Sequence, residues 1–366
     1  MRKKALLVAM IMLLVVVLGA CGGGNAPANN AEANNTEATN NEAAGTETEA
    51  SDLKVGFVTD EGGINDQSFN QGVWEGLQKA KEDFGIEITY QESNDANDYA
   101  PNIETLIDED CDLILAAGFN LGDVFLEAAE MNPDRLFAIV DVAYEEAPEN
   151  LVGLNFKAQE PSFLVGYIAG LMTEEDHVGF VGGQESTLII DFESGFIGGV
   201  NYAAKELDKE IETTVQYVGN FTDAAKGKSI ATNMYQQGAD IVFHASGGAG
   251  DGVIKAAEEN DKWAIGVDRD QNDMAPDNVL TSAMKRADVA VYNVINDYVT
   301  TGEFPGGTNI INGLADGETV GIAPTSDKNV PPEILEKVDG IIQQIIDGEI
   351  EVPSTREEVE AAKAAQ

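Results

Sequence analysis

The chain has little of the chemistry that metal centres and nucleophilic enzymes need. Among its 366 residues are two cysteines and two histidines. The histidines, His177 and His244, lie far apart in the sequence, and no Cys/His spacing typical of a metal site occurs. Nothing in the sequence supports a Ser-His-Asp or Cys-His catalytic arrangement. We therefore predict no metal site, no cofactor and no catalytic residue.

Basic residues are also scarce. The chain has 21 Lys and Arg against 65 Asp and Glu, a formal net charge of −44 at pH 7. A field of that sign repels polyanions, so nucleic acid and anionic lipid surfaces are poor candidate partners. The sequence also has no phosphate-binding loop, which disfavours free nucleotides. We interpret the charge as a solvated surface suited to salty or alkaline surroundings, and it says little about the identity of a ligand.

The main apolar run, from Ala5 to Leu18, is shorter than the roughly 20 residues of a spanning helix. It follows a basic cluster at residues 2–4, which is typical of a secretion signal. The next residues, Leu-Gly-Ala-Cys-Gly at 18–22, resemble a bacterial lipobox. We predict a signal peptide at residues 1–20 and a diacylated Cys21 that anchors the mature chain on the extracellular face of the cell membrane. The alternative is a membrane anchor that is never cleaved.

Residues 21–52 are rich in Asn, Ala, Glu, Thr and Gly and contain almost no large apolar side chain. Such a segment cannot bury enough surface to offset its chain entropy, so it is predicted to be a disordered linker behind the lipid anchor. The other cysteine, Cys111, precedes the apolar run at residues 113–116 and is predicted to be a buried, inert thiol. The remaining chain is long enough for two domains.

From residue 53 on, short apolar runs alternate with amphipathic stretches. The pattern predicts strands at 54–59, 87–91, 113–117, 136–140 and 152–156, then at 178–182, 214–218, 241–244, 264–267 and 280–284, with short extended pieces at 309–312 and 319–322. It predicts helices at 67–84, 101–109, 122–131, 192–207, 223–237, 251–259, 288–301 and 332–347.

Strands that alternate with helices imply right-handed crossovers and parallel sheets. Two complete series and a returning tail predict an α/β fold of two doubly wound, Rossmann-like lobes joined by a multi-strand hinge. The predicted domains are 53–157 plus 286–318 for the N-terminal lobe, 158–285 plus 319–352 for the C-terminal lobe, and 353–366 for a C-terminal tail.

Carboxylates follow three of the predicted strands. Asp60, Asp141 and Asp268 come directly after apolar runs, two in one lobe and one in the other. In open α/β sheets ligands bind beyond the carboxyl ends of the strands, so we expect these side chains to converge on one cleft. The nearest cations by sequence are Lys285, at the end of another strand, and Arg269. The alternative for each aspartate is a turn former or helix cap.

Aromatic residues supply flat apolar surface near the same strand ends. Phe69 and Phe196 lie early in the first helix of each series, where their rings could sandwich a planar ligand. The alternative is that both rings belong to the core. Phe192 and Phe243 compete with Phe196 as the aromatic of the C-terminal lobe.

Glycines follow other predicted strands and let backbone amides approach a ligand closely. Gly118, with Phe119 beside it, follows the strand at 113–117, and Gly247 follows the strand at 241–244. We therefore include all three among the ligand-binding candidates.

The segment VTDEGGINDQSFNQ at residues 58–71, with WEG at 74–76, resembles the opening signature of the basic membrane protein family of ABC-importer substrate-binding lipoproteins. The likeness continues through VD at 140–141, ESGFIGG at 193–199, QGADIVF at 237–243, GVD at 266–268 and SAMK at 282–285. The resemblance implies a fold like the type I periplasmic binding proteins. It also implies closure on a purine nucleoside, and ABC permease and ATPase subunits as partners.

The resemblance also implies roles for individual residues. Asp60 and Asp141 would hydrogen-bond the base, and Phe69 and a second-lobe aromatic would stack on it. Asp268 and Lys285 would hold the ribose hydroxyls. Further ligand-binding candidates lie within the opening signature: Asn65, Asp66 and Asn70.

A purine nucleoside fits these residue types, because it is uncharged and has two flat faces, donors on the base edge and a vicinal diol. Carboxylates accept from such donors in charge-assisted hydrogen bonds. A sugar or another small neutral signal molecule would use similar residues on the same fold. A surface nucleoside hydrolase is a further alternative, although the chain lacks a carboxylate-rich metal loop such as DxDxxxDD. An adhesin or sensor without a transport role is the last alternative.

Overall fold

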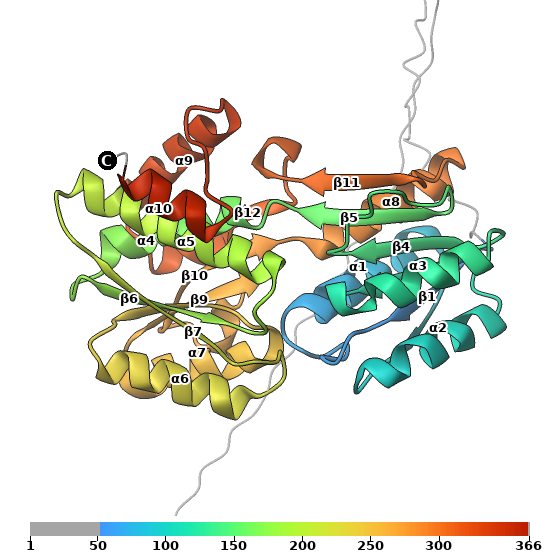
Figure 1. Ribbon diagram of the computed structural model, residues 1–366, viewed down its shortest axis with the longest axis horizontal. Coiled ribbons are helices and arrows are strands. Elements are labelled where there is room, and N and C mark those ends of the chain that lie inside the picture. The colour runs from blue at the N-terminus through green and yellow to red at the C-terminus, as the bar shows by residue number, and fades with distance from the viewer. Residues whose placement is uncertain (1–51, 365–366) are drawn as a thin grey trace, which may run out of the picture. The chain divides into compact units, whose positions relative to one another are not determined.

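The computed structural model describes residues 52–364, which belong to one compact unit. It contains two six-stranded sheets with helices packed on both faces of each (Figure 1). Each sheet with its helices is called a lobe, N-terminal for the first and C-terminal for the second. The two-lobed α/β fold predicted from the sequence is confirmed.

The sheet of the N-terminal lobe is entirely parallel, in the order β11-β5-β4-β3-β1-β2. Helices α2 and α3 cover one face, and α1 and α8 pack together on the other. The strands are β1 (Lys54–Val58), β2 (Glu87–Gln91), β3 (Leu113–Ala117), β4 (Leu136–Val140), β5 (Leu151–Phe156) and β11 (Thr308–Asn312). The helices are α1 (Phe69–Phe84), α2 (Tyr99–Asp108), α3 (Gly122–Met131) and α8 (Ala287–Thr301).

The sheet of the C-terminal lobe has the order β12-β10-β9-β8-β6-β7, and only its β10–β12 pair is antiparallel among the described strands. Helices α6 and α7 cover one face, and α4 and α5 the other. The strands are β6 (His177–Gly182), β7 (Glu212–Tyr217), β8 (Ile241–Ala245), β9 (Trp263–Asp268), β10 (Val279–Lys285) and β12 (Val320–Ile322). The helices are α4 (Gln159–Met172), α5 (Thr187–Glu206), α6 (Ala224–Gln236), α7 (Gly250–Asn260), α9 (Pro332–Ile346) and α10 (Arg356–Ala364).

Six short 3₁₀ helices occur in the connections of the described chain: η1 (Ala96–Asp98), η2 (Phe119–Leu121), η3 (Gly247–Ala249), η4 (Asn272–Met274), η5 (Leu314–Asp316) and η6 (Pro324–Lys328). The chain passes between the two sheets after β5, after β10 and between β11 and β12. Strand β11 lies in the first sheet and β12 in the second, and the lobe boundaries given from the sequence stay a prediction.

Two helices were not predicted. One is α4, in which most residues are buried, so it has no polar face and no amphipathic stripe. It also contains glycines: a Cβ on Gly166 would lie 2.2 Å from the Phe196 carbonyl oxygen of α5. The other is α10, which lies within the predicted tail and packs against α5.

The predicted signal peptide, the lipidated Cys21 and most of the linker lie outside the described residues. Cys111 is fully buried, as predicted, and burial raises the pKa of its thiol to about 11. Within residues 52–364, no helix combines the length and the apolar character that a membrane span requires.

Candidate functional site

A cavity lies where the carboxyl ends of strands from both sheets meet, with about 550 Å³ of empty space when the solvent at its open mouth is included. The N-terminal lobe contributes Asp60, Gly62, Asp66, Phe69, Asn70, Gly118, Phe119 and Asp141 to its lining. The C-terminal lobe contributes Leu188, Ile189, Phe192, Phe221, Ala245, Ser246, Gly247, Gly248, Val267, Asp268 and Lys285. Strand ends and the first turns of helices therefore supply the site, as the fold class predicts.

Asp141 and Asp268 occupy equivalent places in the two lobes. Asp141 follows β4 and Asp268 ends β9, the corresponding strand of the other sheet. Both have left-handed backbone conformations, with φ of 69° and 64°. Aspartate tolerates this conformation better than most residues do. The same kind of turn thus follows the corresponding strands β4 and β9, and each lobe directs one carboxylate to the cavity.

Lys285 is the only Lys or Arg among the residues that line the cavity, and it is buried. Its Nζ forms an ion pair with Asp141 Oδ2 and lies 3.8 Å from Asp268 Oδ1. It also lies 4.2 Å from the centre of the Phe69 ring, in cation–π range. One buried cation therefore joins a carboxylate of each lobe to an aromatic ring. The other oxygen of Asp141, Oδ1, is buried and has no hydrogen-bond partner within the described chain.

Asp60 lies on the N-terminal side of the cavity. Its Oδ1 accepts hydrogen bonds from Asn70 Nδ2 at 2.7 Å and from the Gly62 N–H at 3.0 Å. Desolvation outweighs these bonds and raises the pKa of Asp60 to about 6. Gly118 has φ 107°, and a Cβ there would lie 2.8 Å from Asp60 Oδ2, so glycine is required for this close approach.

Asp268 has the same character on the C-terminal side. Ser68 Oγ donates to its Oδ2 at 2.5 Å, across the lobes. Burial raises its pKa to about 6, although the nearby Lys285 and the Ser68 hydrogen bond act in the opposite direction. Both carboxylates are poorly solvated, so additional donors from a ligand would stabilise their charged forms.

Asp66 has a structural role in addition to lining the cavity. Its carboxylate accepts from the backbone N–H groups of Ser68, Asn70 and Gln71, at 3.0, 2.9 and 3.0 Å. These are free donors of the first turn of α1, which a carboxylate satisfies well. Asp66 therefore fixes the start of the helix that presents Phe69 and Asn70. Asn70 also keeps a buried Oδ1 without a partner among the described residues.

The C-terminal lobe supplies the apolar part of the wall. Leu188, Ile189 and Phe192 come from the first two turns of α5, which Ser186 caps by accepting from the Ile189 N–H. Phe221, in the loop after β7, contacts Phe119 of the other lobe edge to face, with ring centres 6.2 Å apart. Aromatic and aliphatic side chains thus face the carboxylates across the cavity.

Two of the predicted site residues do not line the cavity. Asn65 is exposed in the loop before α1. Phe196 is fully buried and packs with Phe180 and Phe243 in the core, with ring centres 6.3 and 5.2 Å from it. The sequence motif around Phe196 serves helix packing, because a Cβ on Gly199 would lie 2.0 Å from the Phe163 carbonyl oxygen of α4. The prediction that the Phe196 ring faces the cavity is therefore wrong.

Of the other predicted candidates, Gly247 lines the cavity with φ 54°. Arg269 is directed away from it and pairs with Glu75 at 3.1 Å. Phe243, the other alternative aromatic, is core. Phe221 was missed, although the strand-end rule applied to β7 would have found it four residues beyond the strand. No group of three or more His, Cys, Asp or Glu side chains in residues 52–364 is placed to hold a metal ion.

Comparisons with known proteins agree with this geometry. Residues 53–356 match the family described as ABC transporter substrate-binding protein PnrA-like. The chain is 40% identical to the CD4+ T-cell-stimulating antigen of Listeria monocytogenes, over 96% of this chain and 98% of that protein. It is 39% identical to Basic membrane protein A of Borreliella burgdorferi, over 84% and 89%. It is 38% identical to the ABC transporter nucleoside-binding protein BmpA of Lactococcus lactis, over 83% and 90%.

A solved structure has the same fold. A solute-binding protein of an ABC transporter system from Aeropyrum pernix K1 aligns with a TM-score of 0.77 and 26% identity, covering 84% of this chain and 96% of that one. Fold, cavity and sequence agree, and the chain belongs to the basic membrane protein family of PnrA-like ABC transporter substrate-binding proteins.

Proposed function

We propose that this protein is an extracellular lipoprotein that captures a purine nucleoside in the cavity between its lobes and delivers it to an ABC permease. The observation that carries the proposal is the convergence of Asp60, Asp141, Asp268 and Lys285 on one cavity whose remaining wall is largely aromatic and aliphatic. The nucleoside-binding protein of Lactococcus lactis, 38% identical to this chain, supports the ligand class.

The chemistry of each wall matches one part of a nucleoside. Asp60 and the free Oδ1 of Asp141 accept from donors on the edge of the base. Phe69 and the aromatic rings of the C-terminal lobe, Phe192 and Phe221, cover its faces. Asp268 and Lys285 hold the ribose hydroxyls, one as acceptor and the other as donor.

The charge of the cavity selects against phosphorylated ligands. Four aspartates and one lysine line it. A phosphate brought next to these carboxylates would be repelled, and the low dielectric of the cavity strengthens the repulsion. The proposed ligand is therefore the nucleoside and not the nucleotide.

Delivery depends on anchoring and on closure. A diacylated Cys21, followed by a linker, would keep the lobes beside a permease and its ATPase. The three passes of the chain between the lobes would act as the hinge that opens and closes the cavity. We propose no catalytic step for this protein.

A thermal-shift screen tests the ligand class, because a ligand that binds only the folded form raises the melting temperature. The screen compares purine nucleosides, pyrimidine nucleosides, free bases, nucleotides and pentoses. We expect the largest shifts with purine nucleosides and none with their monophosphates. A shift with pentoses alone would favour the sugar alternative and contradict the proposal.

Calorimetry with Asp268→Ala tests the site. We expect weaker binding of inosine and a retained fold, because Asp268 lies at the cavity and outside the apolar core. Asp273→Ala, an exposed position in the same lobe, is the control. Equal inosine affinity of wild type and Asp268→Ala would remove Asp268 from the site.

A further inference from the structure

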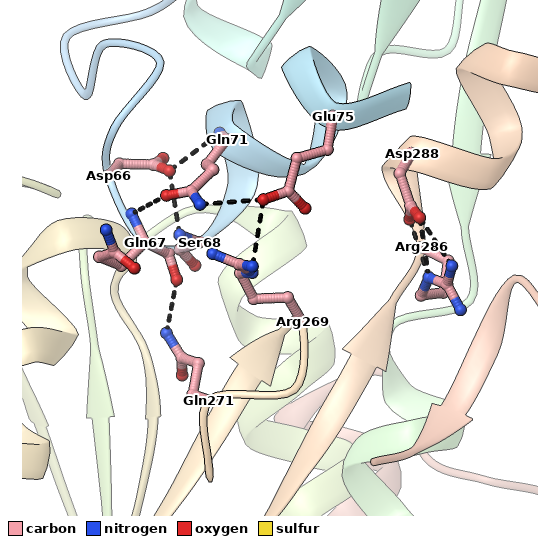
Figure 2. A network of polar contacts seen from close by, with 9 residues as sticks. All are labelled: Asp66, Gln67, Ser68, Gln71, Glu75, Arg269, Gln271, Arg286 and Asp288. Atoms are coloured by element: carbon pink, nitrogen blue, oxygen red, sulfur yellow. Dashed lines mark hydrogen bonds and ion pairs between the residues drawn. The ribbon is translucent and has the colours of Figure 1, made fainter. Parts of the chain in front are cut away.

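The two lobes are also joined by polar contacts outside the cavity. Figure 2 shows the loop after β9 facing the start of α1. Arg269 Nη2 pairs with Glu75 Oε1 at 3.1 Å, and Gln271 Nε2 donates to the Gln67 carbonyl oxygen at 3.0 Å. The Arg269–Glu75 pair is partly exposed, and such pairs contribute little to stability. The Gln271 bond differs, because Gln271 is only 1% exposed.

The Gln271 side chain is held in one orientation by its own lobe. Its Oε1 accepts from the Val267 N–H at 2.9 Å and lies 3.0 Å from His244 Nε2. Burial lowers the pKa of His244 to about 4, so the ring is neutral at neutral pH. Because an amide oxygen only accepts, the ring hydrogen is on Nε2. The amide nitrogen of Gln271 is thereby directed at the other lobe.

The acceptor in the other lobe is fixed too. Gln67 has φ 54°, a left-handed conformation that few residues adopt. Its own N–H donates to Gln71 Oε1 at 3.2 Å. Gln67 lies in the same loop as Asp66, two residues before α1, which begins at Phe69. A bond to its carbonyl therefore sets the distance between the ligand-contacting segment of one lobe and β9 of the other.

We propose that Gln271 is a positioning residue for ligand capture: its side-chain amide, oriented by His244 and the Val267 N–H, bonds the Gln67 carbonyl and holds the lobes closed. Gln271 is absent from the cavity lining, so it acts without touching the ligand. This inference deepens the proposed function and rests on it. A bond that exists only in the closed form slows ligand release more than it speeds capture.

The test uses Gln271→Glu, which keeps the side-chain shape and the acceptor for Val267 and His244 but loses the N–H donor. Gln271→Asn, one methylene shorter and neutral, is the second variant if the glutamate proves hard to fold. Gln236→Glu is the matched control, because Gln236 is exposed in the same lobe. Stopped-flow binding of inosine gives the association and dissociation rates. Spin labels at Glu127 and Ala225, both exposed and one in each lobe, report the interlobe distance.

We expect Gln271→Glu to release inosine roughly tenfold faster, with association changed about twofold or less, and to populate longer interlobe distances. Gln236→Glu should match wild type. Unchanged release and distances in a folded Gln271 variant would overturn the inference and leave the proposed function intact. If wild type binds no purine nucleoside, the proposed function fails. The inference is then judged on the unliganded proteins, and equal distance distributions overturn it.

Discussion

The two lobes share one sheet topology but contribute different kinds of side chain to the cavity. Their sheets correspond strand for strand, with β1 matching β6, β3 matching β8 and β4 matching β9. Yet the N-terminal lobe lines the cavity mainly with polar groups, and the C-terminal lobe mainly with apolar ones. Apart from Asp141 and Asp268, equivalent strand ends thus carry different kinds of side chain, so the fold determines where the cavity lies and the local sequence determines its chemistry.

The last strand of each sheet differs as well. In the N-terminal lobe β11 runs parallel to β5, whereas in the C-terminal lobe the three-residue β12 runs antiparallel to β10. Both strands follow the last passes of the chain between the lobes. The symmetry of the two sheets therefore fails at the strands beside the hinge, where the chain must change lobes.

Removing the cation shared by the two lobes should have the largest effect. Lys285→Met leaves Asp141 and Asp268 buried without their positive partner. Breaking a buried ion pair on one side costs about 3–5 kcal/mol. We expect a clear loss of thermal stability and of nucleoside binding. The exposed Lys255→Met is the control, and a Lys285→Met protein that melts and binds like it would refute a shared role for Lys285.

Substitution of two phenylalanines of the C-terminal lobe should distinguish a core residue from a cavity residue. Phe196→Ala removes a fully buried ring and should cost about 3–5 kcal/mol of the free energy of unfolding. Phe221→Ala removes a half-buried ring at the cavity and should mainly weaken nucleoside binding, by about 1–2 kcal/mol. Chemical denaturation and calorimetry on both variants measure the contrast. The reverse pattern would show that the cavity wall is assigned wrongly.

The buried carboxylates Asp60 and Asp268 should contribute more to the stability of the unliganded protein at acidic pH than at neutral pH. The pKa of Asp60 is raised to about 6, so the folded form holds its proton after the unfolded form has lost it. The contribution of Asp60 to the free energy of unfolding is therefore fully present below about pH 4, falls as pH rises to about 6, and is lost above that value. Asp60→Asn should make this fall shallower, by about 1–2 kcal/mol across the window.

Melting temperatures of wild type and Asp60→Asn across that window give the measurement, with exposed Asp134→Asn as the control. The slope should not vanish, because burial also raises the pKa of Asp268 to about 6. Parallel pH profiles for wild type and Asp60→Asn would mean that Asp60 is as well solvated as an ordinary surface carboxylate.

The smallest effect concerns the contact between α10 and α5 in the C-terminal lobe. Arg356 of α10 bonds the buried Glu193 of α5 at 2.7 and 2.8 Å, and also Glu185. Arg356 is half exposed, and the Tyr217 hydroxyl still donates to Glu193 when Arg356 is removed, so Arg356→Ala should cost only about 1 kcal/mol in denaturation experiments. Because α5 also carries Phe192, nucleoside binding should weaken slightly. A loss as large as that of Lys285→Met would mean that α10 is essential to the C-terminal lobe.

The fold could be predicted because most of the parallel strands are short apolar or β-branched runs followed by a polar turn. That rule gave β2, β3 and β4 with their observed bounds, and it placed Asp60, Asp141 and Asp268 at the cavity. Asp and Gly at strand ends are visible in sequence, since the turn itself requires them. This rule predicted Asp60 and Asp141 on the N-terminal side of the cavity, whereas Asp66 and Asn70 were predicted from the family signature.

The apolar wall could not be predicted, because core and site use the same residue types. The predicted start of α5, at residue 192, was five residues late, since the buried α4 beside it hides the usual amphipathic pattern. With α5 beginning at Thr187, Phe192 lies in the second turn and Phe196 about 6 Å deeper on the same face. Because Phe196 lies about one helical turn beyond Phe192, the late start led to Phe196, a core residue, being predicted at the cavity in place of Phe192.

The most direct test of the account is a crystal structure of the protein with a bound purine nucleoside. We expect the base between Phe69 and the aromatic rings of the C-terminal lobe, with Asp60 or Asp141 at its edge and Asp268 and Lys285 at the ribose. A nucleoside bound outside this cavity, or one in it that makes no hydrogen bond to any of the three aspartates, would contradict it.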